Sequence, residues 1–300
     1  MPGPDLAPTA RADDERVDAA LVGAGLDALD TPTLAARPRW RRAVSTLGPP
    51  LIALVAFIAA WQGLWASAVF PEYKVPAPLA VGDQIWAQVR NGQALSILWT
   101  SVHRAVLGFT AAVLVATPLG LVVAKVPVVR SAIGPLLTGL QSLPSVAWVP
   151  AAVLWFGLTD ASIYFVVLMG AVPSIANGLI AGIEAIPPLL PRVGIAMGAG
   201  RWQTARHILL PAALPGYLAG CKQGWAFSWR SLMAAEIIAS SPALGLGLGQ
   251  FLHNGQSLND MPMVIAAIGL IFAVGVGIEL LVFRPAERRV LRTRGLGLAT

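Results

Sequence analysis

Long stretches without a charged residue are the feature that most limits how this chain can fold. No Asp, Glu, Lys or Arg occurs in residues 43–71, 105–124, 131–159 or 161–183. A helix needs about 20 apolar residues to cross the hydrocarbon core of a bilayer, and each stretch is long enough. Only 12% of all residues are charged, which is about half the fraction in a soluble domain. The sequence therefore predicts an integral membrane protein rather than a soluble helical bundle.

These stretches, together with two later segments, predict an all-α protein with six transmembrane helices. The predicted spans are about 50–66, 105–124, 135–157, 161–183, 214–239 and 262–283. Pro144 and Pro150 lie in the third span and predict a kink or an irregular turn there. The fifth span is the least apolar, because it contains Lys222, Arg230 and Glu236.

The uneven distribution of charge predicts how the chain is divided and oriented. Residues 1–36 hold seven acids and two arginines, a net charge of −5, so the remainder of the +6 chain carries +11. We expect a disordered tail at 1–40, a transmembrane domain at 41–292 with a cytoplasmic loop at 184–213, and a short tail at 293–300. Six spans place both termini on one side, and the excess of Lys and Arg in the loops of that side predicts that it is cytoplasmic. Basic loops also explain the high isoelectric point without a nucleic-acid partner.

Catalytic and metal-binding patterns are not found in the sequence. His103, His207 and His253 are scattered, with no carboxylate or cysteine at the spacing of a metal site. The lone cysteine, Cys221, is interpreted as a packing residue. No Gly-x-x-x-x-Gly-Lys-Ser/Thr loop is present, so we do not expect the chain to hydrolyse ATP.

The loop before the fifth span has the pattern of two short helices joined by a glycine turn. Residues 191–211 read PRVGIAMGAGRWQTARHILLP. Gly198 and Gly200 permit a sharp turn, and apolar residues recur at helical spacing after it. An apolar face on the cytoplasmic side must be covered either by the rest of this chain or by a second protein.

This loop resembles the cytoplasmic loop of bacterial ABC importer permeases. The family pattern is Glu-Ala-Ala, three residues, Gly, nine residues, Ile, any residue, Leu, Pro; its later part matches Gly198, Ile208, Leu210 and Pro211. The opening Glu-Ala-Ala falls on Arg192-Val193-Gly194 and is not kept. The stretches QSLPSVAWVP (141–150), LWFG (154–157), LPAALP (210–215), WRSLMAAE (229–236) and VPAP (75–78) resemble the nitrate/sulfonate/taurine branch. The similarity covers about residues 50–292.

The resemblance implies a permease subunit of a type I importer in the bacterial inner membrane. Two copies would form a homodimer in the bilayer above two cytoplasmic ATPase subunits, which would bind ATP and Mg. An external solute-binding protein would deliver a small anionic solute of the sulfonate, taurine or nitrate type. The chain itself would hold no cofactor. The alternative is an autonomous secondary transporter or channel, and dependence of uptake on a partner ATPase would distinguish the two.

In the family, the short helix after the loop glycine docks on the ATPase. The residues that carry this role here would be Gly198, Ala199, Gly200, Arg201, Trp202, Ala205, Arg206, Ile208, Leu210 and Pro211. An aromatic side chain in a pocket is a common energetic centre of an interface, which favours Trp202 as the anchor. The alternative interpretation is a tryptophan that touches lipid headgroups.

Two charges in the fifth span, Arg230 and Glu236, are candidates for the translocation path or for gating. Charged groups inside a membrane are costly, so they are functional candidates. The two residues are six positions apart, about 240° around a helix, and should face different sides. Arg230 either attracts an anion in the path or pairs with a carboxylate or carbonyl of another span. Glu236 is interpreted as structural or gating rather than as a solute contact.

Overall fold

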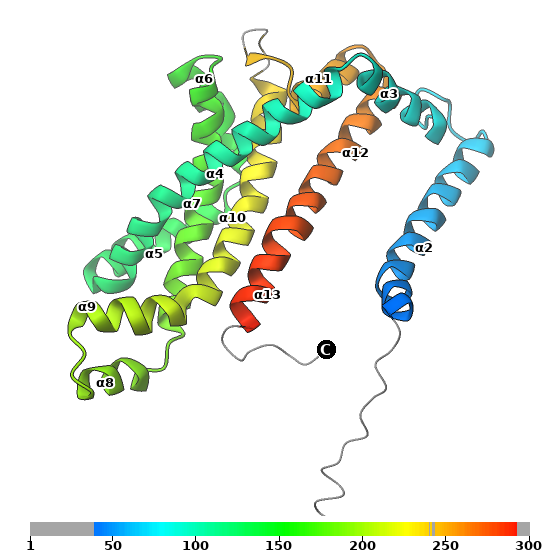
Figure 1. Ribbon diagram of the computed structural model, residues 1–300. Coiled ribbons are helices and arrows are strands. Elements are labelled where there is room, and N and C mark those ends of the chain that lie inside the picture. The colour runs from blue at the N-terminus through cyan, green and yellow to red at the C-terminus, as the bar shows by residue number, and fades with distance from the viewer. Residues whose placement is uncertain (1–38, 240, 242–243, 293–300) are drawn as a thin grey trace, which may run out of the picture. The chain divides into compact units, whose positions relative to one another are not determined.

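The computed structural model describes residues 39–239, 241 and 244–292, and every regular element among them is a helix (Figure 1). The all-α class is confirmed for these residues. The chain divides into two compact units, residues 1–63 and 64–300. The predicted tails lie outside the described residues, except for Arg39 and Trp40, which begin helix α2 (Arg39–Ala66).

Among the described residues, four helices are long and apolar enough to cross a membrane. They are residues Gly48–Ala66 of α2, α4 (Gln93–Lys125), α7 (Asp160–Glu184), and the continuous helix Met261–Arg292, which consists of α12 (Met261–Ile278), the π-helical turn η4 (Glu279–Phe283) and α13 (Arg284–Arg292). The predicted number of six spans is therefore not confirmed.

The third predicted span is two helices that meet at a sharp bend. Helix α5 (Pro127–Ser142) is followed by the short helix η1 (Ser145–Trp148) and α6 (Val149–Phe156), and the two parts are inclined by 98°. The break falls at Leu143 and Pro144, because proline cannot donate the hydrogen bond that would continue the helix. Counted as one broken span, this pair raises the number of apolar spans to five.

The fifth predicted span is helix α10 (Leu210–Ile238), whose 29 residues extend about 43 Å at 1.5 Å per residue. It is long enough to cross a bilayer, but it is less apolar than the helices counted above, and it contains Lys222, Arg230 and Glu236. One of these charges, Lys222, has its Nζ 2.5 Å from a carboxylate oxygen of Glu279 and 3.6 Å from one of Glu287.

Helices α7 and α10 cross with their backbones in contact. A Cβ atom on Gly178 would lie 2.3 Å from the Cα of Gly220, and one on Gly216 would lie 2.5 Å from the Cα of Gly182. Each helix thus contributes two glycines four positions apart, the spacing that lets membrane helices approach closely. Helix α7 also packs against α4, α5 and α6, which makes it the centre of the second unit.

Short helices cover the two ends of this unit (Figure 1). At one end lie α3 (Pro78–Arg90) and α11 (Leu248–Ser257), near the start of α4. At the opposite end lie α8 (Leu189–Ala196), α9 (Arg201–Thr204) and the π-helical turn η2 (Ala205–Leu209), which leads into α10. These two ends hold the candidate functional residues.

Candidate functional site

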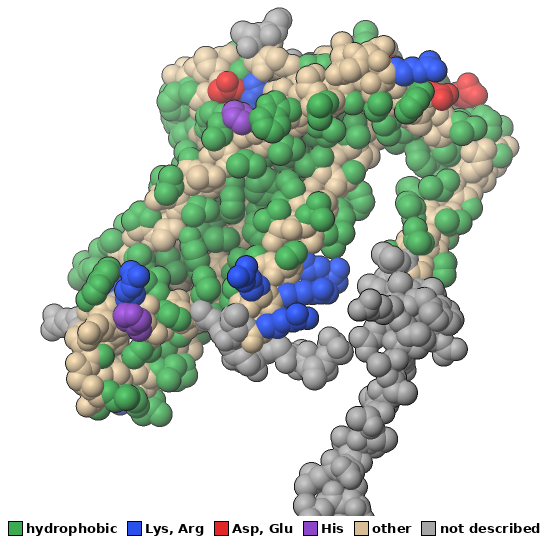
Figure 2. All heavy atoms as spheres, viewed as in Figure 1, with side chains coloured by type: hydrophobic (Ala, Val, Ile, Leu, Met, Phe, Trp, Pro, Cys, Tyr) green, Lys and Arg blue, Asp and Glu red, His purple; other side chains and the backbone are tan. Residues whose placement is uncertain are grey.

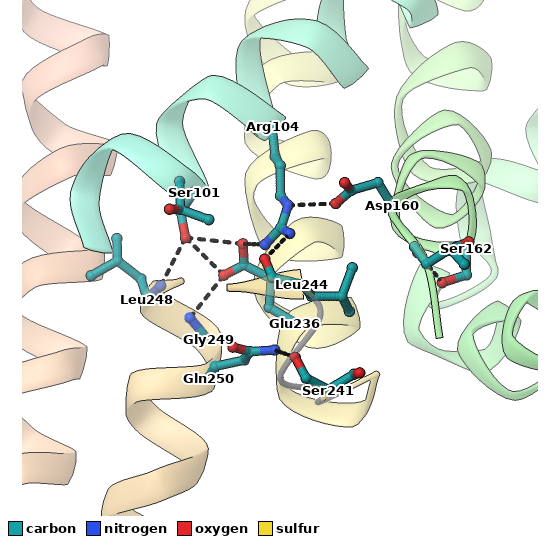
Figure 3. A network of polar contacts seen from close by, with 12 residues as sticks. Ser101, Arg104, Asp160, Ser162, Glu236, Ser241, Leu244, Leu248, Gly249 and Gln250 are labelled. Carbon is teal, nitrogen blue, oxygen red and sulfur yellow. Dashed lines mark hydrogen bonds and ion pairs between the residues drawn. The ribbon is translucent and has the colours of Figure 1, made fainter. Parts of the chain in front are cut away.

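Arg104 of α4 joins three segments at the end of the bundle that carries α11 (Figure 3). Its Nε donates to Asp160 Oδ1 at 2.8 Å, and its Nη1 donates to Glu236 Oε1 at 3.2 Å. Its Nη2 donates to the carbonyl oxygen of Leu244, in the loop between α10 and α11. Arg104 is only 5% exposed, so all three guanidinium nitrogens have protein acceptors in place of water. The side chain connects α4 to α7, to α10 and to the loop.

Glu236, near the end of α10, is 1% exposed and caps helix α11. Its Oε2 accepts hydrogen bonds from Ser101 Oγ at 2.8 Å and from the backbone N–H of Gly249 at 2.9 Å. Ser101 Oγ in turn accepts from the backbone N–H of Leu248 at 2.8 Å. The N-cap residue of α11 is Gly247, which has no side chain to satisfy the free N–H groups of the first turn. The carboxylate from α10 supplies that acceptor and its negative charge suits the positive end of the helix dipole.

Two glycines make room for this carboxylate. A Cβ atom on Gly247 would lie 2.6 Å from both Glu236 carboxylate oxygens. A Cβ atom on Gly249 would lie 2.5 Å from the Glu236 Cβ and 2.8 Å from the carbonyl oxygen of Met233. A larger residue at either position would force α10 or the start of α11 to shift.

The network places one cation between two carboxylates of different exposure. Glu236 is fully buried, whereas the Asp160 side chain is 54% exposed at the first turn of α7. A buried carboxylate is tolerated when it is paired and hydrogen-bonded, and Glu236 has three such donors. The arrangement holds the ends of α4, α7, α10 and α11 together as a clamp.

Arg230 lies on a different side of α10 from Glu236, as their spacing predicts. Its side chain is exposed, its Nε donates to the carbonyl oxygen of Ala226 at 3.1 Å, and its guanidinium lies 4.7 Å from the centre of the Phe227 ring. Among the described residues no carboxylate pairs with it. Whether Arg230 and Glu236 act in translocation or gating stays a prediction.

Arg104, which directly precedes the second predicted span, 105–124, is not singled out in the sequence analysis. The signal that was available is Ser101 and Arg104, one helical turn apart, just before an apolar stretch. A lone arginine at such a position either is exposed to lipid headgroups or pairs with a buried acid. The sequence does not select between these two arrangements.

The turn between α8 and α9 at the opposite end is built around Gly198. This residue has φ +86°, a conformation that favours glycine. The N–H of Ala199 donates to the carbonyl of Gly194 at 3.0 Å, and the N–H of Gly198 donates to that of Ile195 at 2.9 Å. This pair of bonds is a Schellman C-cap. On the far side of the turn, the N–H of Gly200 donates to the side-chain oxygen of Gln203 at 2.9 Å. Both helix ends are thereby defined locally.

Helix α8 packs against the chain that follows the turn through Gly194. A Cβ atom on Gly194 would lie 2.3 Å from Cδ1 of Ile208. In this chain a side chain at position 194 would meet Ile208 unless the isoleucine shifted. Ile208 thus holds the two short helices together from inside.

The outer surface of this helix pair is apolar. Met197 is 82% exposed and Trp202 is 73% exposed. Leu189, Leu190, Val193 and Ile195 are exposed as well. Among the other predicted docking residues, Gly198, Gly200, Arg206, Leu210 and Pro211 are exposed and Ala199 is half-buried, while the side chains of Arg201 and Ala205 lie outside the described part of the structure.

A comparison with protein families identifies this architecture. Residues 116–288 match the model of the binding-protein-dependent transport system inner membrane component. The matched part includes α7, the α8–α9 pair and α10.

The chain belongs to this family.

Relatives confirm the resemblance to the nitrate/sulfonate/taurine branch. The permease is 30% identical to the taurine transport system permease protein TauC of Escherichia coli (strain K12), over 81% of this chain and 88% of the relative. It is 27% identical to the riboflavin transport system permease protein RibX of Chloroflexus aurantiacus, over 74% of this chain and 81% of the relative. A nitrate import permease protein and a putative aliphatic sulfonates transport permease protein are also related to it.

The fold is shared with a solved transporter. The MetNI methionine ABC transporter, in an inward facing conformation, contains a chain that matches with a TM-score of 0.54 and 18% identity, covering 70% of this chain and 97% of the other. The permease is therefore a multi-pass transport subunit of the inner membrane and not an enzyme, and the expected role as an importer permease is confirmed.

Proposed function

We propose that two copies of this permease form the membrane path of an importer for a small anionic solute. Each copy crosses the bacterial inner membrane six times, with α10 as one of the spans and both termini in the cytoplasm. An external solute-binding protein delivers the solute. Two cytoplasmic ATPase subunits, which bind ATP and Mg, drive the cycle through the α8–α9 pair.

The observation that carries the coupling proposal is the exposed apolar surface around Trp202. A rigid pair of short helices with its large apolar side chains outward costs solvation free energy unless a partner covers it. The Schellman turn and the Ile208 contact keep the pair in one shape, so that a push on one helix moves both. A helix pair with a fixed shape and an exposed apolar surface can bind a second protein and transmit its movement to the bundle.

The proposed crossing by α10 is supported by the way its charges are arranged. Glu236 pairs with Arg104, and Lys222 pairs with Glu279 and Glu287 at the end of the bundle where the basic loops lie. Paired charges lower the cost of placing a helix in the bilayer. The excess of Lys and Arg at this end supports a cytoplasmic position for both termini.

The anionic solute is proposed from the names of the relatives and from Arg230. Taurine, nitrate and aliphatic sulfonates carry oxyanions, which a guanidinium recognises well. Riboflavin is a different kind of solute, so the class must be tested directly. The test is binding of taurine, nitrate, an alkanesulfonate and riboflavin to the solute-binding protein that purifies with the permease; tight binding of riboflavin alone would contradict the anionic class.

The coupling proposal is tested by Trp202→Ala in the full-length permease, purified from membranes that contain its ATPase. Truncation of an interface anchor costs 2 kcal/mol or more in typical cases, so we expect ATPase recovery to fall by about thirtyfold. The control is Trp86→Ala, which removes an exposed tryptophan from α3 at the opposite end of the bundle. Unchanged recovery of the ATPase with Trp202→Ala would show that the docking assignment is wrong. Solute uptake into liposomes by the permease alone, without ATP, would instead identify a secondary transporter.

A further inference from the structure

Four arginines form a basic face on α13, where the last long helix ends. Figure 2 shows Lys and Arg side chains gathered at this end of the helix. Arg284, Arg288 and Arg292 recur every four residues and so lie on one side, with Arg289 beside them. All four side chains are exposed. Together with Leu280 and Pro285 they line a groove of about 380 Å³. We call these four residues the arginine face.

The acidic residue of α13 is engaged by a lysine of α10. Glu287 is the one acidic residue of α13, and its carboxylate lies 3.6 Å from Nζ of Lys222 on α10. Glu279, one turn before α13, pairs with the same lysine. Among the described residues, no carboxylate pairs with Arg284, Arg288 or Arg292. The lysine contacts also hold α13 against α10, which keeps the arginine face turned away from the bundle.

The residues directly before the arginine face are apolar and exposed. Leu281 is 79% exposed, and Leu280 and Val282 are also exposed. They belong to the continuous apolar helix that includes α12, so they are the last side chains of this helix suited to the acyl region of a bilayer. An apolar surface followed at once by clustered arginines matches an amphiphile with an anionic head.

We propose that the arginine face binds the phosphate headgroups of anionic phospholipids. Arginine forms bidentate hydrogen bonds to phosphate, and a cluster of four next to a membrane span gives both charge and geometry for this contact. The acyl chains of the same lipid lie along Leu280 and Leu281. A bound anionic lipid thereby anchors the last helix at the membrane surface, independently of which solute is carried.

The test uses full-length permease equilibrated in bilayers of equal parts phosphatidylcholine and phosphatidylglycerol, with retained lipids counted by native mass spectrometry. The parent protein retains phosphatidylglycerol in preference to phosphatidylcholine. R284Q/R288Q/R292Q loses this preference: each arginine near an anionic surface is worth about fivefold, so the three together are worth about a hundredfold. R284K/R288K/R292K keeps the charge without the bidentate geometry and gives an intermediate preference.

The control K74Q/K125Q/R192Q removes the same charge from scattered positions and retains the parental preference. Parental retention in R284Q/R288Q/R292Q, or an equal loss in the control, would overturn the proposal. So would displacement of phosphatidylglycerol by low concentrations of inorganic phosphate, since that would identify a site for free anions. A preference that appears only after deletion of residues 1–36, which carry a net charge of −5, would assign the face to that acidic segment instead.

Discussion

At the residue scale, the decisive feature is that a buried acid and a buried base depend on each other. Glu236 is hydrogen-bonded by Ser101 and Gly249 and paired with Arg104, while Arg104 also reaches the half-exposed Asp160. Removal of one partner from a buried pair leaves the other charge without compensation, which costs more than the pair itself contributes.

We predict that Arg104→Met lowers the free energy of unfolding by about 3–5 kcal/mol, because Glu236 is left buried without its cation. Asp160→Asn should cost less than about 1 kcal/mol, because the Asp160 side chain is half exposed and water replaces the contact. R104M/E236L should recover part of the loss by removing both charges. Thermal denaturation of each purified variant in detergent measures all three changes in stability. If the Arg104→Met protein is as stable as the Asp160→Asn protein, the Arg104–Glu236 pair does not hold the helix ends together.

A second prediction concerns the space beside Glu236. Gly249→Ala places a Cβ against the Glu236 Cβ and the Met233 carbonyl, neither of which can move freely, so we expect a loss of about 1–3 kcal/mol. Gly269→Ala on α12 is the control, since nothing lies within 4 Å of its Cβ position. It should be neutral or stabilising by up to about 1 kcal/mol, because alanine favours the helix. Equal melting temperatures of the two variants would show that α11 does not pack as described.

At the scale of elements, the α8–α9 pair and the α7–α10 crossing rely on glycine for opposite reasons. Gly198 supplies a positive φ that ends α8 and reverses the chain. Gly178 and Gly220 supply the absence of a side chain, which brings two backbones into contact. The first role could be predicted from the loop sequence. The second could not, because the partner of each small-residue stripe is decided only when the helices pack.

We predict that Gly198→Ala weakens coupling to the ATPase. A left-handed conformation costs alanine about 1–2 kcal/mol, so the docking-competent turn is depopulated by about five- to thirtyfold. Gly198→Asn is the matched variant, because asparagine tolerates this conformation at a helix C-terminus, and it should retain most of the activity. ATP-driven uptake by the assembled transporter is the measurement. Equal uptake by both variants would indicate that the backbone conformation at residue 198 does not affect coupling.

At the scale of the whole molecule, the composition of α10 and its packing give different indications of whether this helix crosses the membrane. It is not among the spans recognised by hydropathy, yet two of its charges, Glu236 and Lys222, are paired within the second unit, whereas Arg230 is exposed. The number of crossings therefore depends on tertiary contacts as well as on apolar length.

The topology prediction is tested with single cysteines in a protein whose Cys221 is replaced by alanine. Met197→Cys lies before α10 and Gln256→Cys lies after it, and both positions are exposed. If α10 crosses the membrane, an impermeant maleimide added to intact cells labels Q256C only, and M197C reacts after permeabilisation. Labelling of both from the same side would exclude the six-span topology.

The sequence by itself determined the helical class, the membrane location, the family and the glycine turn at Gly198. These follow from apolar length and from local backbone geometry, which neighbouring residues specify. Only the tertiary structure decided that Arg104 meets Glu236, that a carboxylate of α10 caps α11, and that Lys222 engages Glu287, while among the described residues no carboxylate pairs with Arg284, Arg288 or Arg292. The Arg104–Glu236 and Lys222–Glu287 pairs join residues far apart in the chain, so only the packing of the helices brings their charges together.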